Sequence, residues 1–240
     1  MAMRYTILRC AGLLLVTCGL AAENKAVKAK KAPQPAFAKS EDKPGLPRVL
    51  LIGDSISIGY TAPVRELLEG KANVHRIPVN GGPTINGLAN LKSWLGDSKW
   101  DMIHFNWGLH DLKYMGANKE NVADPKSSTS RRQVALPDYE KNLAALVKQM
   151  QETGAKLIWC TTTPVPEDSA GRVAGDEKKY NEAAARVMQA AIVPTDDLCN
   201  HAQAKLKQIQ LPANVHFNPQ GYRYLAEKVA ASILEQLPAK

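Results

Sequence analysis

Residues 48–55 read Arg-Val-Leu-Leu-Ile-Gly-Asp-Ser, the first aliphatic run of the folded part of the sequence. A short aliphatic run that stops at a glycine predicts a strand buried on both faces. Apolar residues at helical spacing follow at Val64, Leu67 and Leu68, and the pattern ends at Gly70. A buried strand followed by an amphipathic helix is the repeating unit of a parallel sheet covered by helices.

The same alternation continues to the C-terminus. Further strands are expected at 73–79, 101–106 and 156–160 and around Ile192-Val193, and helices at 85–95, 139–150 and 180–188. The last helix has the clearest start, because Asn218 can cap it and Pro219 suits its first turn. The pattern predicts an α/β fold, a three-layer sandwich with a central parallel sheet and a flavodoxin-like strand order.

Residues 1–21 have the pattern of a signal peptide. Arg4 and Arg9 give a positive start, the apolar run at 10–16 is too short to span a bilayer, and small residues follow at 19–21. The sequence therefore predicts a secreted or periplasmic protein with no integral membrane segment after cleavage. Lipoprotein anchoring at Cys18 is an alternative, although Thr17 before it fits such a site poorly.

Residues 22–47 are rich in Lys, Ala and Pro and predict a disordered basic tether, because they cannot bury enough apolar surface to offset the entropy of ordering. Residues 48–240 then form the single folded domain. The tether and the signal hold most of the charge excess, and residues 49–240 carry 22 basic and 20 acidic side chains. This balance argues against a nucleic-acid partner.

Chemically useful residues follow the predicted strands. Ser55 follows the first strand, Gly81 and Gly82 follow the second, and residues 108–111 (Gly-Leu-His-Asp) follow the third. His216 precedes the final helix. The carboxyl ends of parallel strands meet at one edge of a sheet, so these residues are expected to lie together. A serine needs an adjacent base to act as a nucleophile, and an oxyanion needs preorganised donors.

These blocks resemble those of the SGNH hydrolases, also called GDSL-type esterases. Residues 53–57 (Gly-Asp-Ser-Ile-Ser) are similar to the first block of that family, residues 80–82 to the second, residues 108–111 to the third and Val215-His216 to the fifth. The resemblance implies an SGNH hydrolase fold and a serine esterase in which Ser55 is the nucleophile and His216 the base. It also implies an oxyanion hole formed by the amides of Ser55 and Gly82, or Gly81, with His110.

Two positions depart from the pattern of that family. His110 stands where the family has an asparagine donor, and a histidine bonded to Asp111 or to a carbonyl is the structural alternative. Ala213 stands where the family has the triad aspartate, and Asn214 is the nearest polar residue. We expect a Ser55–His216 dyad steered by a backbone carbonyl. Two alternatives are open: Asp196 or Asp197 replaces the missing triad aspartate, or the site is catalytically impaired.

The resemblance implies hydrolysis of O-acetyl esters on a small molecule or polysaccharide, and Trp107 is a candidate to stack on a sugar ring or to pack beneath the loop. The first alternative is a catalytically impaired relative that binds glycans or surfaces. The second is a lipid esterase or lysophospholipase. No metal or cofactor is expected, because no sequence motif has the required spacing. The polar insertion at 113–136 is a candidate lid or a plain surface loop. Cys160 and Cys199 are a possible disulfide or two free thiols.

Overall fold

Five parallel strands form the central sheet of the protein, for which the computed structural model describes Met1, residues 35–118 and residues 120–237. The strand order is β2-β1-β3-β6-β7, which confirms the predicted flavodoxin-like arrangement. The strands are β1 (Arg48–Ile52), β2 (Asn73–Arg76), β3 (Met102–Phe105), β6 (Lys156–Cys160) and β7 (Thr195–Asp196). The predicted α/β class is therefore also confirmed.

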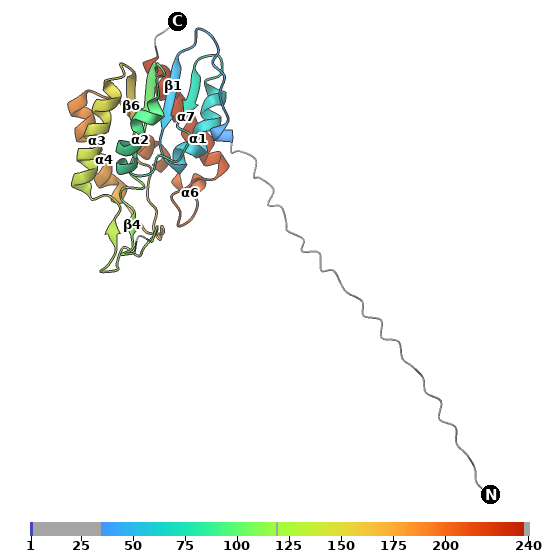
Figure 1. Ribbon diagram of the computed structural model, residues 1–240, viewed down its shortest axis with the longest axis vertical. Coiled ribbons are helices and arrows are strands. Elements are labelled where there is room, and N and C mark those ends of the chain that lie inside the picture. The colour runs from blue at the N-terminus through green and yellow to red at the C-terminus, as the bar shows by residue number, and fades with distance from the viewer. Residues whose placement is uncertain (2–34, 119, 238–240) are drawn as a thin grey trace. The chain divides into compact units, whose positions relative to one another are not determined.

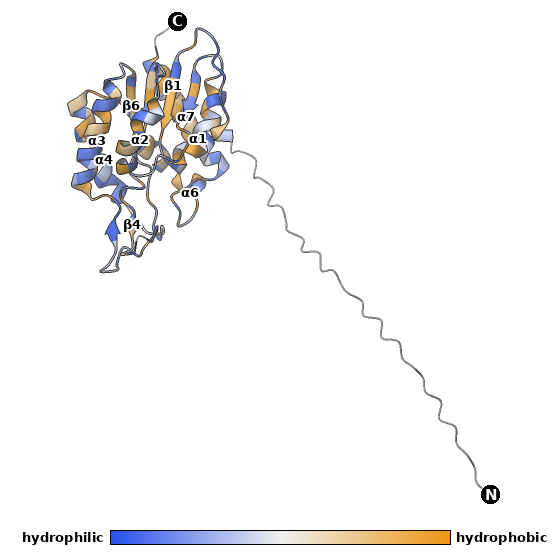
Figure 2. Ribbon diagram, viewed as in Figure 1, coloured by the Kyte–Doolittle hydropathy of each residue, from blue (hydrophilic) through white to orange (hydrophobic). Residues whose placement is uncertain are grey.

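Helices cover both faces of this sheet. Helices α1 (Ser55–Leu67) and α7 (Pro219–Gln236) pack together, and α3 (Leu136–Gln151) packs against both α2 (Thr84–Leu95) and α4 (Asp176–Ala191) (Figure 1). The strands in the middle of the sheet are coloured mainly as hydrophobic, and the helices carry both hydrophobic and hydrophilic residues (Figure 2). Residues 49–52 of β1 are at most 2% exposed, as expected for a strand covered on both faces.

The register of the sheet brings the site residues to one edge. Strand β1 lies between β2 and β3, and Ile52 at its end is paired with Phe105 at the end of β3. The chain therefore leaves β1 toward Ser55 and leaves β3 toward His110 at the same edge. The predicted start of the last helix is also confirmed, since Asn218 caps α7 by accepting a hydrogen bond from the Gly221 N–H.

The position predicted for the fifth strand is wrong. Ile192 ends α4 in the left-handed conformation, with φ of 56°, and is 91% exposed. The strand lies slightly later, at Thr195–Asp196, where it pairs with β6. Aliphatic character alone misplaced the strand, because Ile192 terminates a helix on the surface while the buried Asp196 occupies the sheet. Two short helices, α5 (Leu198–Gln203) and α6 (Leu206–Ile209), then lead toward His216.

Part of the predicted tether packs against the domain. Residues 35–47 are described and include a short 3-10 helix, η1 (Pro35–Phe37), while the predicted signal peptide and residues 22–34 lie outside the described residues. Lys43 and the Asn73 side chain exchange hydrogen bonds of 2.8 and 3.0 Å, and Ala36 is buried. The ordered part therefore begins before the predicted boundary at Arg48.

The insertion at 113–136 contains a small antiparallel hairpin. Strands β4 (Tyr114–Met115) and β5 (Arg131–Arg132) pair with each other and project from the body of the domain (Figure 1). The base of the hairpin is fixed to the loop that follows β6, because the Tyr114 N–H donates to the Gly171 oxygen at 2.7 Å. The insertion therefore stands beside the edge of the sheet that carries Ser55.

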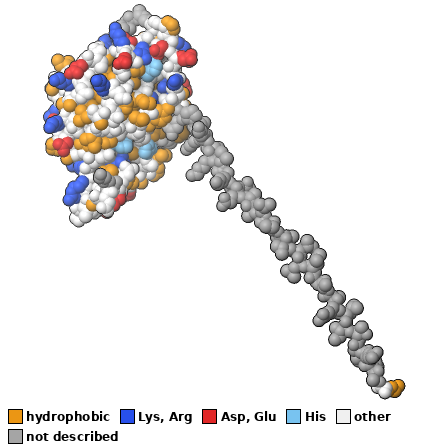
Figure 3. All heavy atoms as spheres, in the orientation of Figure 1, with side chains coloured by type: hydrophobic (Ala, Val, Ile, Leu, Met, Phe, Trp, Pro, Cys, Tyr) orange, Lys and Arg blue, Asp and Glu red, His pale blue; other side chains and the backbone are white. Residues whose placement is uncertain are grey.

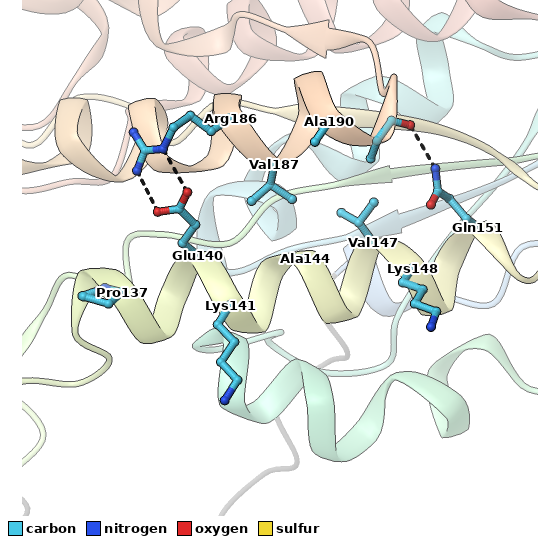
Figure 4. Close-up of a pocket in the computed structure, with 11 residues that line it drawn as sticks. Pro137, Glu140, Lys141, Ala144, Val147, Lys148, Gln151, Arg186, Val187 and Ala190 are labelled. Carbon is cyan, nitrogen blue, oxygen red and sulfur yellow. Dashed lines mark hydrogen bonds and ion pairs between the residues drawn. The ribbon is translucent and has the colours of Figure 1, made fainter.

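A groove of about 610 Å³ lies along the outer side of the contact between α3 and α4 and is lined by residues of both helices (Figure 4). It contains none of the predicted site residues, and an ion pair of 2.7 Å joins Arg186 to Glu140 at its side.

Within the described residues, no helix combines the length and the apolar character needed to cross a bilayer. Cys160 and Cys199 are free thiols and form no disulfide. Basic and acidic side chains are interspersed on the visible face of the domain (Figure 3).

Candidate active site

Ser55 lies at the junction of β1 and α1 and is partly exposed. The preceding Asp54 caps α1, since its Oδ1 accepts a hydrogen bond of 2.9 Å from the Ile56 N–H. Gly53 is required by close packing, because a Cβ at this position would lie 2.8 Å from the Ser57 Cβ. The turn therefore combines a helix cap at Asp54 with an accessible hydroxyl at Ser55.

His216 is brought to Ser55 from the far end of the sequence. The Ser55 Oγ lies 2.8 Å from His216 Nε2. The loop that carries the imidazole is fixed on both sides, because the Leu211 N–H donates to the His216 oxygen and Asn218 begins α7 two residues later. The structure thus places the predicted nucleophile and base within hydrogen-bonding distance.

Asn214 occupies the place of the missing acid. Its Oδ1 lies 2.7 Å from His216 Nδ1 and also accepts a hydrogen bond of 3.0 Å from the backbone N–H of His216. A backbone N–H can only donate, so the Asn214 atom that faces the histidine is its oxygen. An acceptor at Nδ1 favours the tautomer with hydrogen on Nδ1, which leaves Nε2 free to take the proton of Ser55. The steering carbonyl belongs to a side chain, whereas a backbone carbonyl was expected.

The aspartates considered as substitutes are engaged elsewhere. Asp196 is fully buried and its Oδ2 lies 3.0 Å from His104 Nε2. Asp197 caps α5 by accepting a hydrogen bond from the Asn200 N–H. Neither carboxylate contacts His216, so the geometry does not support the alternative in which one of them replaces the acid. Ala213 is exposed, with φ of 51°.

The glycine donors differ in their availability. The Gly81 N–H donates to the Gly53 oxygen at 3.0 Å and ties the loop to the end of β1. The Gly82 N–H donates at 2.9 Å to the exposed side chain of Asn80, which a substrate oxygen can displace more readily than a backbone partner. Gly82 also has φ of 62°, a conformation that favours glycine. The geometry therefore favours Gly82 over Gly81 as a donor.

His110 lies in the loop after β3 and has no hydrogen-bond partner for its ring among the described residues. Asp111 bonds instead to Thr84, so the predicted structural alternative for His110 finds no support in the contacts. Burial lowers the pKa of His110, the negative charge of Asp54 raises it, and the positive charges of Lys113 and Arg172 act in the same direction as burial. A neutral imidazole can donate one N–H to an oxyanion at pH 7.

Asp111 connects the second and third blocks. Its Oδ1 accepts hydrogen bonds of 2.8 Å from the Thr84 N–H and 2.5 Å from the Thr84 hydroxyl, at the start of α2. Asp111 is fully buried, and burial raises the pKa of its carboxyl to about 7 against the hydrogen bonds from Thr84. Asp111 therefore joins the loop of His110 to the loop of Gly82, and we infer that it fixes the position of one loop relative to the other.

The loop before His110 is also tightly packed. A Cβ at Gly108 would lie 2.1 Å from the Thr162 hydroxyl, so only glycine fits there. Trp107 is 1% exposed, and the Tyr139 hydroxyl donates to its backbone oxygen at 2.9 Å. Trp107 therefore packs beneath the loop, and the alternative that it stacks on a sugar ring is wrong.

Arg172 is a neighbour of the site that the sequence pattern did not single out. It lies in the loop after β6, and its Nε donates a hydrogen bond of 3.0 Å to the oxygen of Leu109, the residue before His110. The position of this loop beyond the carboxyl end of a strand was the available signal. No motif distinguishes this arginine from others in the sequence.

Three buried side chains form a cluster with metal-ligating atoms. His104, Cys160 and Asp196 come from three adjacent strands, and one ligand atom of each lies within 4.8 Å of the others. Burial raises the pKa of the Cys160 thiol, which opposes the thiolate that a metal needs. Lys228 Nζ lies 3.9 Å from Asp196 Oδ1 and already supplies a positive charge. These residues fit an internal ion-pair network better than a metal site.

The model of the GDSL-like Lipase/Acylhydrolase family matches residues 51–224. No curated protein matches the chain.

Solved structures share the fold at low sequence identity. A lipase/acylhydrolase from Enterococcus faecalis is 19% identical with a TM-score of 0.66, and the match covers 81% of this chain and 99% of that chain. An acetylxylan esterase from Geobacillus stearothermophilus is 18% identical with a TM-score of 0.63 over 78% and 94% of the two chains. Because the family model spans most of the domain, including Ser55 and His110, the chain belongs to the GDSL-like lipase/acylhydrolase family, also called the SGNH hydrolases, and is a serine ester hydrolase.

Proposed function

We propose that this protein is an exported carbohydrate O-acetylesterase that works through an acyl-enzyme, with Ser55 as nucleophile and His216 as base. The observation that carries the proposal is the continuous hydrogen-bonded chain from Ser55 through His216 to Asn214, with distances of 2.8 and 2.7 Å. This chain has the nucleophile, base and orienting acceptor that serine catalysis requires.

In the first half of the reaction, the Ser55 Oγ attacks the ester carbonyl and its proton passes to His216 Nε2. The developing oxyanion accepts hydrogen bonds from the Ser55 N–H, which has no partner among the described residues, and from His110. The Gly82 N–H adds a third donor once the Asn80 side chain moves aside. The leaving alcohol then takes the proton from His216, and the acyl group remains on Ser55.

In the second half, water attacks the acyl-enzyme. His216 Nε2 takes a proton from this water and returns it to Ser55 as the carboxylic acid departs. The same donors hold the second oxyanion. Each such donor contributes roughly 3 kcal/mol to transition-state stabilisation. No step requires a group beyond the residues named.

The acyl group and the alcohol of the substrate are inferred from the structural neighbours. Several structures with this fold come from enzymes described as acetylxylan esterases, but at 17–18% identity they support the fold and only suggest the substrate. Burial of Trp107 removes one expected sugar contact. Ser55, Gly82, His110 and His216 are partly exposed, which suits a substrate that is presented at the surface.

A chain-length series of p-nitrophenyl esters tests this proposal. We expect acetate to be hydrolysed faster than butyrate and octanoate, and acetylated oligosaccharides to release acetate. Ser55→Ala is the control for every substrate. A preference for octanoate would support the lipid esterase, and binding of glycans without any Ser55-dependent hydrolysis would support the impaired relative.

Export is a separate part of the proposal, and it rests on the pattern of residues 1–21. N-terminal sequencing of protein from the native host tests it. We expect a mature chain that begins near Ala22 and is recovered outside the cytoplasm. A lipid-modified Cys18 would replace free export by membrane anchoring, and an intact Met1 on cytoplasmic protein would contradict export altogether.

A further inference from the structure

Two positively charged side chains near His110 have no carboxylate partner among the described residues. Lys113 is 3% exposed, and its Nζ donates one hydrogen bond of 2.7 Å, to Asn121 Oδ1. Arg172 is partly exposed and donates to the backbone oxygens of Leu109 and Ala170. In the part of the chain that the structure describes, no carboxylate oxygen lies within 4.0 Å of either cation. A charge that is largely removed from water and has no counter-charge lowers the stability of the folded protein.

The two cations and His110 lie in one neighbourhood. Arg172 donates to the residue before His110, and the backbone N–H of Lys113 donates to the His110 oxygen at 3.4 Å. The positive charge of Arg172 adds to burial in lowering the pKa of Lys113, and both cations act on the pKa of His110. Positive charge therefore accumulates beside the proposed oxyanion hole.

The acidic residues nearby do not neutralise this charge. Asp54 is buried and caps α1. Its negative charge raises the pKa of Arg172 and of His110, but it forms no ion pair with either side chain. Burial raises the pKa of Asp111 to about 7, so near neutral pH a large fraction of this carboxyl is protonated. The surroundings of Arg172 and Lys113 therefore carry excess positive charge, and an anionic ligand can supply the missing negative charge.

The geometry of Arg172 suits a carboxylate. Its Nε and Nη1 are anchored at 3.0 and 3.3 Å, whereas Nη2 has no partner among the described residues. The edge formed by Nη1 and Nη2 carries parallel N–H donors, which match the two oxygens of a carboxylate. An anchored guanidinium also loses little conformational entropy on binding.

We propose that Arg172, supported by the fixed charge of Lys113, binds a carboxylate of the substrate, so that the enzyme prefers acetylated sugar chains that carry uronic acids. The inference rests on the ester hydrolysis proposed above and adds the chemical class of the sugar.

A matched pair of substrates tests the preference. An O-acetylated oligogalacturonide and its carboxyl-reduced counterpart carry the same ester, and only the first is anionic. We expect kcat/KM to be about tenfold or more higher for the acidic form, the factor that a charge-assisted hydrogen bond supplies. Raising NaCl from about 0.02 M to about 0.5 M should increase KM for the acidic form alone, since salt screens exposed charge pairs.

Two variants locate the preference. Arg172→Gln should lower the ratio of the two kcat/KM values by about tenfold. Lys126→Gln, which removes an exposed charge from the same insertion, should leave the ratio unchanged. Arg172→Lys keeps the charge but loses the paired donors, and we expect an intermediate ratio. Circular dichroism checks that each variant is folded.

Equal hydrolysis of both sugars by the wild-type enzyme would overturn the inference while leaving the esterase intact. An acid preference that persists in folded Arg172→Gln would also overturn it. Failure to hydrolyse even p-nitrophenyl acetate would instead contradict the proposed function, and the inference would fall with it.

Discussion

Asn214 Oδ1 lies 2.7 Å from His216 Nδ1, and it takes the position that a carboxylate holds in most serine triads. The amide oxygen fixes the tautomer but carries no full negative charge to stabilise the imidazolium formed during attack. We therefore expect Asn214→Asp to raise kcat/KM for p-nitrophenyl acetate by about tenfold or more. Asn214→Ala should lower it, since nothing then selects the tautomer.

Ala213→Asp is the matched control for this prediction. It adds the same charge one residue earlier, at an exposed position with φ of 51° that does not contact His216 Nδ1 in the structure. Its effect on kcat/KM should be smaller than that of Asn214→Asp. A larger gain from Ala213→Asp would mean that the loop rearranges and that Asn214 is not the orienting residue.

His110 provides the next test. If its ring donates to the oxyanion, His110→Ala should lower kcat by ~10²-fold or more, the effect of losing one donor. His110→Asn should recover much of this loss, because an amide N–H can replace the imidazole N–H. Single-turnover measurements on both variants separate acylation from deacylation.

An unchanged kcat in His110→Ala, in a protein of normal thermal stability, would assign His110 to structure alone. Recovery by asparagine distinguishes the two roles, because a purely packing role has no reason to favour an amide.

Asp111 should make the stability depend on pH. Its pKa is about 7 in the folded protein and near 3.8 in the unfolded chain, so between these values the folded state binds more protons. The free energy of unfolding should therefore fall as the pH rises from about 4 to about 7, with a slope that approaches 1.4 kcal/mol per pH unit. Above this window the contribution of Asp111 is constant.

Urea unfolding at several pH values, with Asp111→Asn as the reference, isolates this contribution from those of other groups. The variant keeps an oxygen for Thr84 but cannot ionise. If wild type and variant have parallel profiles between pH 4 and 7, Asp111 does not carry the shifted pKa.

The sequence predicted the elements whose signals are local. The aliphatic run of β1 and the cap and proline of α7 appear as expected, because periodicity and capping depend on neighbouring residues. The fifth strand was misplaced since Ile192 is apolar yet ends a helix, while Asp196 is polar yet buried against His104. The end of α4 at Ile192 and the start of β7 at Thr195 are set by contacts with other parts of the fold, which local sequence does not show.

The residues of the candidate site likewise differ in whether local sequence could indicate them. The sequence singled out Ser55 and His216 because each stands next to a recognisable strand or helix end and in a block that resembles the family pattern, and the structure brings the two side chains together. The contact of Asn214 with His216 Nδ1 was not predicted, since the Asn214 side chain has to turn toward the backbone and the ring of His216, two residues later, to make it. Arg172 was missed for a different reason: only the folded loop brings it to Leu109, 63 residues away in sequence.

Covalent labelling determines whether Ser55 is the nucleophile. A fluorophosphonate probe should modify this one residue in the wild-type protein, and peptide mass spectrometry identifies the site. Ser55→Ala should fold normally, resist the probe and lose p-nitrophenyl acetate hydrolysis by several orders of magnitude, because among the described residues Ser55 is the hydroxyl that hydrogen-bonds to His216 Nε2. Labelling of a different serine, or an active and folded Ser55→Ala, would contradict the account.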